Sequence, residues 1–447
     1  MQPVCQNKRR AMKNIVRLMI KSICVMLPMI VIYAYTWMNP MGFMDGETPH
    51  YLWNKEKVNS PEDWYYDTII LGDSMANAAY MPEILSDTVI NLSLGGMTPV
   101  ENYYVLQDWL TTHSAPKVCY ISFQDAHLLM EDCFWTRTMY SHRFRPEQNL
   151  EMVRLAKIFH EPTIITDSYK SDFISYELRL PNKYIAAIMN SGFNQRYEEN
   201  LETQRKDELH RGRYIAREAE GFEGGKKGVL EEFYLNPLFE DYYRRLIGLC
   251  VENNIQVRIV KLPHSDNISF TDEYKAQVYE FYENLKKDFP GITVDWIAAY
   301  DRQCFIDANH LNSYGALRFS SEIKKLYPKD FGSEPLSPSQ AEAIDDSMLH
   351  VKKGEQLAEW ILGRDYTLFL HNGSQVYSIS GLNNRKGERE VCQLENGLTV
   401  WMEPSNAWEW EEPVIGDLNI VAVDNYNKKI VFQKAFWQEN ESYVLIE

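Results

Sequence analysis

The chain of 447 residues is predicted to be an α/β protein, a three-layer sandwich built on a parallel sheet of roughly five strands. We also expect an N-terminal transmembrane helix and a small C-terminal β-rich domain. Three observations lead to this prediction. Short β-branched runs alternate with long helical patterns, as in βαβ crossovers. A charge-free apolar stretch precedes them, and short strand patterns separated by turn residues follow them.

The first 40 residues have the composition of a membrane anchor. Residues 1–21 carry six Lys and Arg residues and no acid, and residues 22–38 carry no charge. A spanning helix needs about 17 to 25 apolar residues, and bases on one flank place that flank in the cytoplasm. We therefore predict a cytoplasmic tail over 1–21, a transmembrane anchor over 22–40 and an extracytoplasmic remainder. A cleaved signal peptide is the alternative, although Trp37–Pro40 would be a poor cleavage site.

The overall composition excludes some classes of partner. The formal charge is −17, and it becomes −23 when the six positive charges of residues 1–21 are set aside. Nucleic-acid binding needs a basic surface, so we expect no nucleic-acid partner. Seven cysteines show neither a CxxC pair nor metal-ligand spacing, so we expect no metal and no other cofactor.

Five apolar runs are predicted to be strands buried on both faces, because they lack period-two alternation. They lie at residues 67–71, 88–91, 117–123, 255–262 and 292–297.

Helical patterns occupy residues 99–111, 236–253 and 271–288, which separate these strands. Residues 126–232 are too long for an ordinary connection and are predicted to be an insertion over the ends of the sheet. The whole domain would then cover residues 60–330.

The last quarter of the chain is predicted to form a separate domain over residues 351–447, after a linker at 331–350. A helix is expected near residues 353–362. Strand patterns follow it at residues 366–370, 375–379, 398–401, 418–423 and 429–432. Aromatic faces suit sugar rings, so Trp401, Trp408 and Trp410 are candidates either for glycan stacking or for packing in a small core.

A serine follows the first predicted strand directly, in Gly72-Asp73-Ser74, ahead of a helix-compatible stretch at 76–85. This position lies at the carboxyl edge of a parallel sheet, where α/β proteins build their sites. Gly72 is expected to let the backbone turn tightly. The structural alternative is that Asp73 or Ser74 only caps the helix.

A second motif lies after the last predicted strand, where Asp307 stands three residues before His310. In such a loop the carboxylate can orient the imidazole, which in turn takes a proton from a serine. Because both motifs follow strands of one parallel sheet, we predict that they meet at its edge.

These motifs resemble the GDSL/SGNH hydrolases over roughly residues 65–328. Gly72-Asp73-Ser74 is similar to the first block of that family, residues 91–96 to the second, and Asp307–His310 to the last. The resemblance implies an SGNH/flavodoxin-like fold. It also implies that Ser74 is the nucleophile, His310 the general base and Asp307 its orienting carboxylate.

The resemblance further implies an oxyanion hole formed by the backbone amides of Ser74 and Gly96. The third block departs from the family, because Gln124 stands where an Asn is usual. We expect the longer Gln124 side chain to serve as the further donor. Asp125, beside it, and His264, after the fourth strand, are predicted to contact substrate at the same edge.

The altered third block, the anchor and the insertion together resemble the extracytoplasmic branch of the family, which includes alginate acetylation proteins and the D-alanyl-lipoteichoic acid transfer protein. That resemblance implies transfer of an acyl group, most simply acetyl, to a polysaccharide through an acyl-Ser74 intermediate. It also implies a membrane-bound O-acyltransferase partner. A surface ester hydrolase using the same residues and a non-catalytic assembly protein remain the alternatives.

Overall fold

A computed structural model describes most of the chain and divides it into two compact units, residues 1–53 with 132–205 and residues 54–131 with 206–447. The predicted helix near 353–362, Trp408, Trp410 and all but the first residue of the predicted linker lie outside the described residues. The described residues are 2–44, 46–61, 65–129, 133–214, 228–265, 267–300, 302–331, 366–371, 376–380, 389–393, 399–404, 417–424, 430–439 and 442–445.

The second unit contains a five-stranded parallel sheet in the order β2-β1-β3-β5-β7. Each predicted strand is confirmed to within one residue at either end. This strand order is flavodoxin-like, so the switch point of the sheet lies between β1 and β3. The strands are β1 (Thr68–Gly72), β2 (Val89–Asn91), β3 (Val118–Ser122), β5 (Gln256–Lys261) and β7 (Thr293–Trp296).

The helices between these strands also lie close to the predicted ranges. The stretch predicted as a single helical segment over 76–85 is divided instead into α3 and α4, because Tyr80 and Met81 adopt extended backbone ahead of Pro82. A residue before proline disfavours the helical conformation. The helices are α3 (Ser74–Ala79), α4 (Pro82–Leu85), α5 (Pro99–Thr112), α10 (Pro237–Glu252), α11 (Asp272–Asp288) and α12 (Ser313–Leu326).

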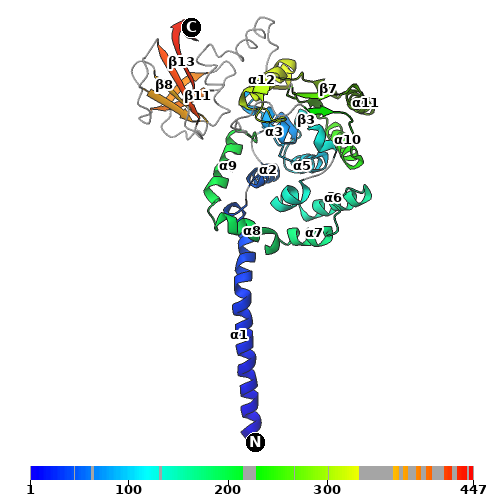
Figure 1. Cartoon of the computed structure of the whole chain (residues 1–447), viewed down its shortest axis with the longest axis vertical. Coiled ribbons are helices and arrows are strands. Elements are labelled where there is room, and N and C mark those ends of the chain that lie inside the picture. The colour runs from blue at the N-terminus through cyan, green and yellow to red at the C-terminus, as the bar shows by residue number, and fades with distance from the viewer. Residues whose placement is uncertain are drawn as a thin grey trace. The chain divides into compact units, whose positions relative to one another are not determined.

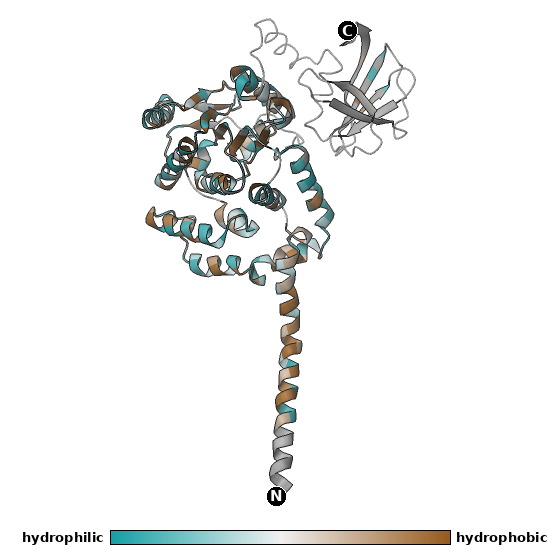
Figure 2. Cartoon of the chain, turned by 180° about the vertical axis from the view of Figure 1, so that it is seen from behind, coloured by the Kyte–Doolittle hydropathy of each residue, from teal (hydrophilic) through white to brown (hydrophobic). Residues whose placement is uncertain are grey.

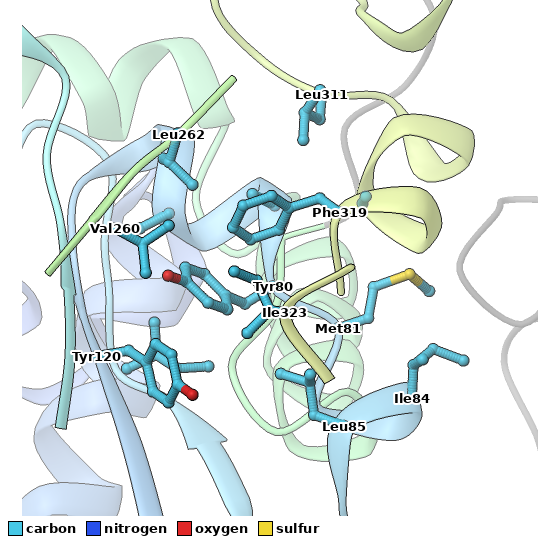
Figure 3. Packing of buried hydrophobic residues seen from close by; sticks show 14 of the residues in the cluster. Tyr80, Met81, Ile84, Leu85, Tyr120, Val260, Leu262, Leu311, Phe319 and Ile323 are labelled. Carbon is cyan, nitrogen blue, oxygen red and sulfur yellow. The ribbon is translucent and has the colours of Figure 1, made fainter. Parts of the chain in front are cut away.

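One hydrophobic cluster joins the sheet to α3, α4 and α12 (Figure 3). The Tyr80 ring meets the Phe319 ring edge to face at 4.8 Å. The Ser320 hydroxyl accepts a bond from the Met81 amide at 2.8 Å and donates to the Ala79 carbonyl at 3.1 Å. Burial of each large apolar side chain contributes about 1.5 to 3 kcal/mol. This packing fixes α12 against the end of α3.

A second contact region joins α5 to α10, which lie side by side (Figure 1). The hydroxyls of Tyr104 and Tyr242 are hydrogen-bonded at 2.9 Å. Two short strands, β4 (Gly228–Leu230) and β6 (Ile268–Phe270), pair in parallel as a separate small sheet that the sequence patterns do not predict.

The first unit begins with α1 (Gln2–Met38), a continuous helix. The predicted tail and anchor are therefore parts of one helix, and it ends at Met38 rather than at residue 40. Its segment Met12–Met38 contains an 18-residue window with a mean hydropathy of 2.2 and is long and apolar enough to cross a membrane (Figure 2).

The carboxyl end of α1 packs against the helical insertion. Tyr35 contacts Phe43 and Phe193, and the Thr36 hydroxyl donates to the Arg179 carbonyl at 3.0 Å. The grouping of residues 132–205 with the N-terminal helix has no signature in the sequence patterns. The unit also contains η1 (Pro40–Gly42), most of α9 (Tyr197–Leu209), the start of α2 (Thr48–Asn59), the π-helix Phe134–Met139, α6 (Pro146–Ile158), α7 (Tyr169–Glu177) and α8 (Pro181–Ser191).

Seven further strands pair antiparallel in the order β10-β11-β9-β8-β12-β13-β14. Five of them coincide with the strand patterns of the last quarter of the sequence, and β10 and β14 were not predicted. Trp401 lies in β11. The strands are β8 (Tyr366–His371), β9 (Val376–Ser380), β10 (Arg389–Gln393), β11 (Thr399–Pro404), β12 (Leu418–Asp424), β13 (Ile430–Glu439) and β14 (Ser442–Leu445).

Candidate active site

Ser74 is the first residue of α3, directly beyond the end of β1. Gly72 is required here for a different reason from the expected tight turn. A Cβ on Gly72 would lie 2.0 Å from the Ser122 carbonyl oxygen and 2.6 Å from the Ala76 Cβ. The Asn102 side chain bonds both the N–H and the carbonyl of Gly72, at 2.9 and 3.2 Å. The turn into Ser74 is therefore held between β3 and α5.

The capping role falls to Asp73, not to Ser74. One Asp73 carboxylate oxygen accepts the Met75 amide at 2.9 Å, and the other accepts the Gln124 amide at 2.6 Å and lies 2.7 Å from His127 Nδ1. Burial raises the pKa of Asp73. The charge and hydrogen bond of His127 and the two backbone N–H groups together outweigh burial, so the pKa lies below its usual value. Asp73 is thus an ionised structural anchor.

Ser74 itself is partly exposed between two buried neighbours. Its Oγ lies 2.7 Å from His310 Nε2, and His310 Nδ1 lies 2.8 Å from the Asp307 carboxylate. The structure therefore joins the two motifs, 236 residues apart in the chain, in one hydrogen-bonded series.

The Asp307 carboxylate is organised by its own loop. Its second oxygen accepts the amides of Asn309 and His310, each at 2.8 Å. Burial raises the pKa of Asp307, but the His310 ring and these amides outweigh it and lower the pKa to about 2. An ionised carboxylate favours the proton on His310 Nδ1, which leaves Nε2 to accept from Ser74.

Packing behind this loop fixes its distance from Ser74. Leu311 belongs to the same hydrophobic cluster as α3, and Asn312 caps α12 through a 2.9 Å bond from the Gly315 amide. A Cβ on Gly315 would lie 2.2 Å from the Cys304 carbonyl oxygen. Since α12 is also bound to the end of α3, the nucleophile and the base share one rigid support.

The second predicted block braces α3 from the other side. Asn91 donates to the Ala76 carbonyl at 3.2 Å and accepts the Ser93 amide at 3.1 Å. Gly96 follows in a buried loop with φ of +77°, a backbone conformation that favours glycine. The role of Gly96 as an oxyanion donor stays a prediction.

The three other predicted site residues lie in the wall of one cavity of about 990 Å³. Gln124 lies in the wall, and its backbone amide is bound to Asp73. Asp125 forms an ion pair with Lys261 and accepts a hydrogen bond from the Tyr274 hydroxyl, so its carboxylate has two partners within the cavity wall. The His264 ring lies edge-on to Phe270 at 4.6 Å, with Nδ1 3.1 Å from the Ser265 carbonyl.

The sequence patterns did not identify His127, although it lies next to the nucleophile turn through Asp73. The sequence did carry a signal for it, because His127 lies two residues after Asp125 in the short polar segment that follows β3. Because residues from 126 onward were predicted to belong to the insertion, His127 was not considered as part of the site. Within the described part of the chain, no group of three or more His, Cys, Asp or Glu side chains is arranged to hold a metal ion.

Comparisons with known proteins add little to this geometry. No protein-family model matches the sequence, and no curated protein matches it. Among solved structures, the chain is similar to a protein from Streptococcus pneumonia described as a "putative platelet activating factor". The identity is 10%, the TM-score is 0.30, and the match covers 67% of this chain and 98% of that one. A similarity this weak supports no argument, so the site must be interpreted from its own atoms.

Proposed function

We propose that this chain is a membrane-anchored, SGNH-type serine enzyme that transfers an acyl group to a polysaccharide outside the cytoplasm. The observation that carries the proposal is the hydrogen-bonded series from Ser74 through His310 to Asp307. A nucleophile, a base and an orienting carboxylate at these distances are the parts that acyl transfer through serine needs.

The fold supports the same proposal. The strand order and the position of Ser74 after β1, beside the switch point, are those expected of an SGNH/flavodoxin-like sheet. The α5–α10 pair and the α3–α4–α12 group are consistent with helices on both faces, as in a three-layer sandwich. Strands β8 to β14 support a small β-rich accessory domain.

The proposed reaction has two steps. Ser74 Oγ attacks the ester carbonyl carbon while its proton passes to His310 Nε2, and the alcohol then leaves with that proton. The acyl-Ser74 ester is next attacked by a sugar hydroxyl, which gives its proton to His310, and Ser74 is regenerated. The backbone amides of Ser74 and Gly96 and the Gln124 side chain are the proposed donors to the oxyanion, each worth about 3 to 4 kcal/mol.

The location follows from α1. A helix of this length and hydropathy is able to span a bilayer, and the bases before residue 22 favour a cytoplasmic N-terminus. The site would then face the outside of the cell. A membrane-bound O-acyltransferase is the proposed partner that supplies the acyl group, with acetyl as the simplest case.

A fluorophosphonate probe tests the nucleophile. We expect the full-length protein to be labelled and the Ser74→Ala variant not to be. Ser86→Ala serves as the matched control, because Ser86 is half-buried in the same unit and its hydroxyl bonds Thr88, away from the site. Labelling that survives in Ser74→Ala would show that another residue is the nucleophile.

A surface ester hydrolase is the second candidate, because the same three residues also serve when water is the acceptor. Cells carrying the native protein or Ser74→Ala separate the two. A transferase predicts more polymer-bound acyl ester in native cells, and a hydrolase predicts less. Equal amounts would favour the non-catalytic assembly role.

A further inference from the structure

The cavity beside Ser74 is much larger than an acetyl group requires. Its volume of about 990 Å³ lies at the upper end of the roughly 300–1,000 Å³ found for small-molecule sites. It begins at the catalytic residues, since Met75 adjoins Ser74, and Ala308 and Asn309 lie between Asp307 and His310. The cavity is therefore bordered by the chain neighbours of the three catalytic residues.

The walls of the cavity are mainly apolar. They come from the ends of β3 and β5, the small β4–β6 sheet, α11 and the end of β7. The buried or half-buried apolar lining consists of Met75, Phe123, Phe233, Leu262, Ile268, Phe270, Tyr274, Val278 and Ile297.

The outer lip of the cavity leaves large apolar side chains exposed. Val229 is 60% exposed, Tyr279 58% and Trp296 48%, and Leu129 and Leu230 join them. Exposed apolar side chains gathered at one opening mark a binding surface rather than the scattered exposure of an ordinary surface.

Three of the four charged side chains in the cavity wall have an ion-pair partner, and the fourth, Glu232, is exposed to solvent. Lys261 pairs with Asp125, and Lys275 lies 3.7 Å from Asp272. A neutral, extended apolar ligand fits this lining better than a sugar, whose hydroxyls would need polar partners along the walls.

We infer that the cavity holds the linear acyl chain of a lipid ester whose carbonyl carbon Ser74 attacks. The inference rests on the proposed Ser74 chemistry and changes the acyl group from acetyl to a medium or long chain. The bond between the carbonyl carbon and the lipid alcohol breaks, the alcohol takes the proton from His310, and the acyl chain stays in the cavity as the Ser74 ester. A membrane anchor would keep the enzyme beside lipid esters.

A chain-length series tests this assignment. The full-length protein in lipid nanodiscs is assayed with p-nitrophenyl esters from acetate to octanoate. Each buried methylene is expected to raise kcat/KM up to about fourfold, so octanoate should exceed acetate by about 100-fold or more. Leu230→Asn should reduce that ratio about tenfold. Leu326→Asn is the matched control, because Leu326 is 48% exposed against 44% for Leu230 and lies outside the cavity.

The outcomes distinguish the two levels of the proposal. Cleavage of acetate with no gain, or a loss, for longer esters would overturn the acyl-chain assignment and leave the Ser74 chemistry intact. Failure to cleave any ester, together with no fluorophosphonate labelling, would instead reject the proposed function.

A photocrosslinking measurement tests the cavity without catalysis. Ser74→Ala in nanodiscs is irradiated with a glycerol ester of an octanoic acid that carries a diazirine, and the modified peptides are mapped. We expect adducts within 228–233 and 268–279 that octanoylglycerol competes away and acetylglycerol does not. Adducts elsewhere, or adducts that neither competitor affects, would overturn the assignment even if the chain were inactive.

Discussion

Two Asp–His pairs flank Ser74, and they are built in opposite ways. The Asp73 carboxylate is fully buried and lies 2.7 Å from His127 Nδ1, and Asp73 directly precedes the nucleophile in the chain. Asp307 and His310 lie 2.8 Å apart, and the Asp307 side chain is 49% exposed. Both carboxylates also accept backbone N–H groups, and both have a lowered pKa.

The difference between the pairs lies in what each carboxylate holds in place. Asp73 bonds the amides of Met75 and Gln124, so it ties the turn after β1 to the loop after β3. Among the described residues, Asp307 bonds the amides of its own loop and the His310 ring, whose other nitrogen lies beside Ser74 Oγ. The same residue types therefore give a structural pair where the carboxylate joins two strands, and a proposed catalytic pair where the histidine faces the nucleophile.

Replacement of the two histidines should separate the pairs most strongly. His310→Ala is expected to lower kcat/KM about 10⁴-fold or more, because Ser74 loses its base. His127→Ala should change kcat/KM by less than about tenfold, since His127 bonds Asp73, which takes no part in the proposed proton transfer. Steady-state kinetics with the preferred nitrophenyl ester measures both. Similar losses for the two variants would remove the functional distinction between the pairs.

Asp307→Asn should come next in size. The amide keeps the shape of the carboxylate but no longer favours the proton on His310 Nδ1, so kcat/KM is expected to fall about 10³- to 10⁴-fold. Folding should be little affected, because the side chain is half exposed. Native kinetics in the Asp307→Asn variant would mean that His310 is oriented by other groups.

Asp73→Ala should act on stability first. It leaves the Met75 and Gln124 amides and the His127 ring without a buried acceptor, so the free energy of unfolding should fall by about 3 to 5 kcal/mol. Thermal unfolding of the full-length protein in nanodiscs measures the change. Asp307→Ala is the control and should shift the midpoint much less. A midpoint for Asp73→Ala at the native value would contradict the anchoring role.

The dependence of stability on pH is the smallest expected effect. Both carboxylates have a folded pKa below their ordinary value of 3.8. Each therefore stabilises the fold fully above pH 3.8 and loses that contribution as the pH falls, for Asp307 through about pH 2. The midpoint difference between native protein and Asp73→Asn should shrink as the pH falls below about 4. A difference that grows in acid would have the wrong sign.

The sheet was predictable from the sequence because its strands appear as short apolar runs. The prediction that all five are buried on both faces is right for β1, β2 and β3 and wrong for β7, an edge strand whose residues are half-buried or exposed. The Ser74 and Asp307–His310 motifs were predictable for a related reason, since residues that follow parallel strands must meet at one edge of the sheet. Their hydrogen bonds join residues 236 positions apart, yet each motif is local.

Features that depend on contacts between distant segments were not predictable. The need for Gly72 comes from the Ser122 carbonyl on a neighbouring strand. The cap role of Asp73 is local and was considered from the sequence, but its bonds to Gln124 and His127 in the loop after β3 were not predictable. The division of α3 from α4 did have a local signal, Pro82, but the helical pattern of residues 76–85 was given more weight in the prediction. The packing of the insertion against α1 and the β4–β6 pairing leave no periodic trace in the sequence.

The most direct test of the proposed chemistry is to trap the acyl-enzyme. The full-length protein is mixed with an activated ester, quenched in acid within seconds and digested, and the peptides are weighed by mass spectrometry. The account predicts an acyl adduct on Ser74 that neutral hydroxylamine removes and that is absent from Ser74→Ala and His310→Ala. An adduct on another residue, or turnover of the ester without any adduct on Ser74, would contradict it.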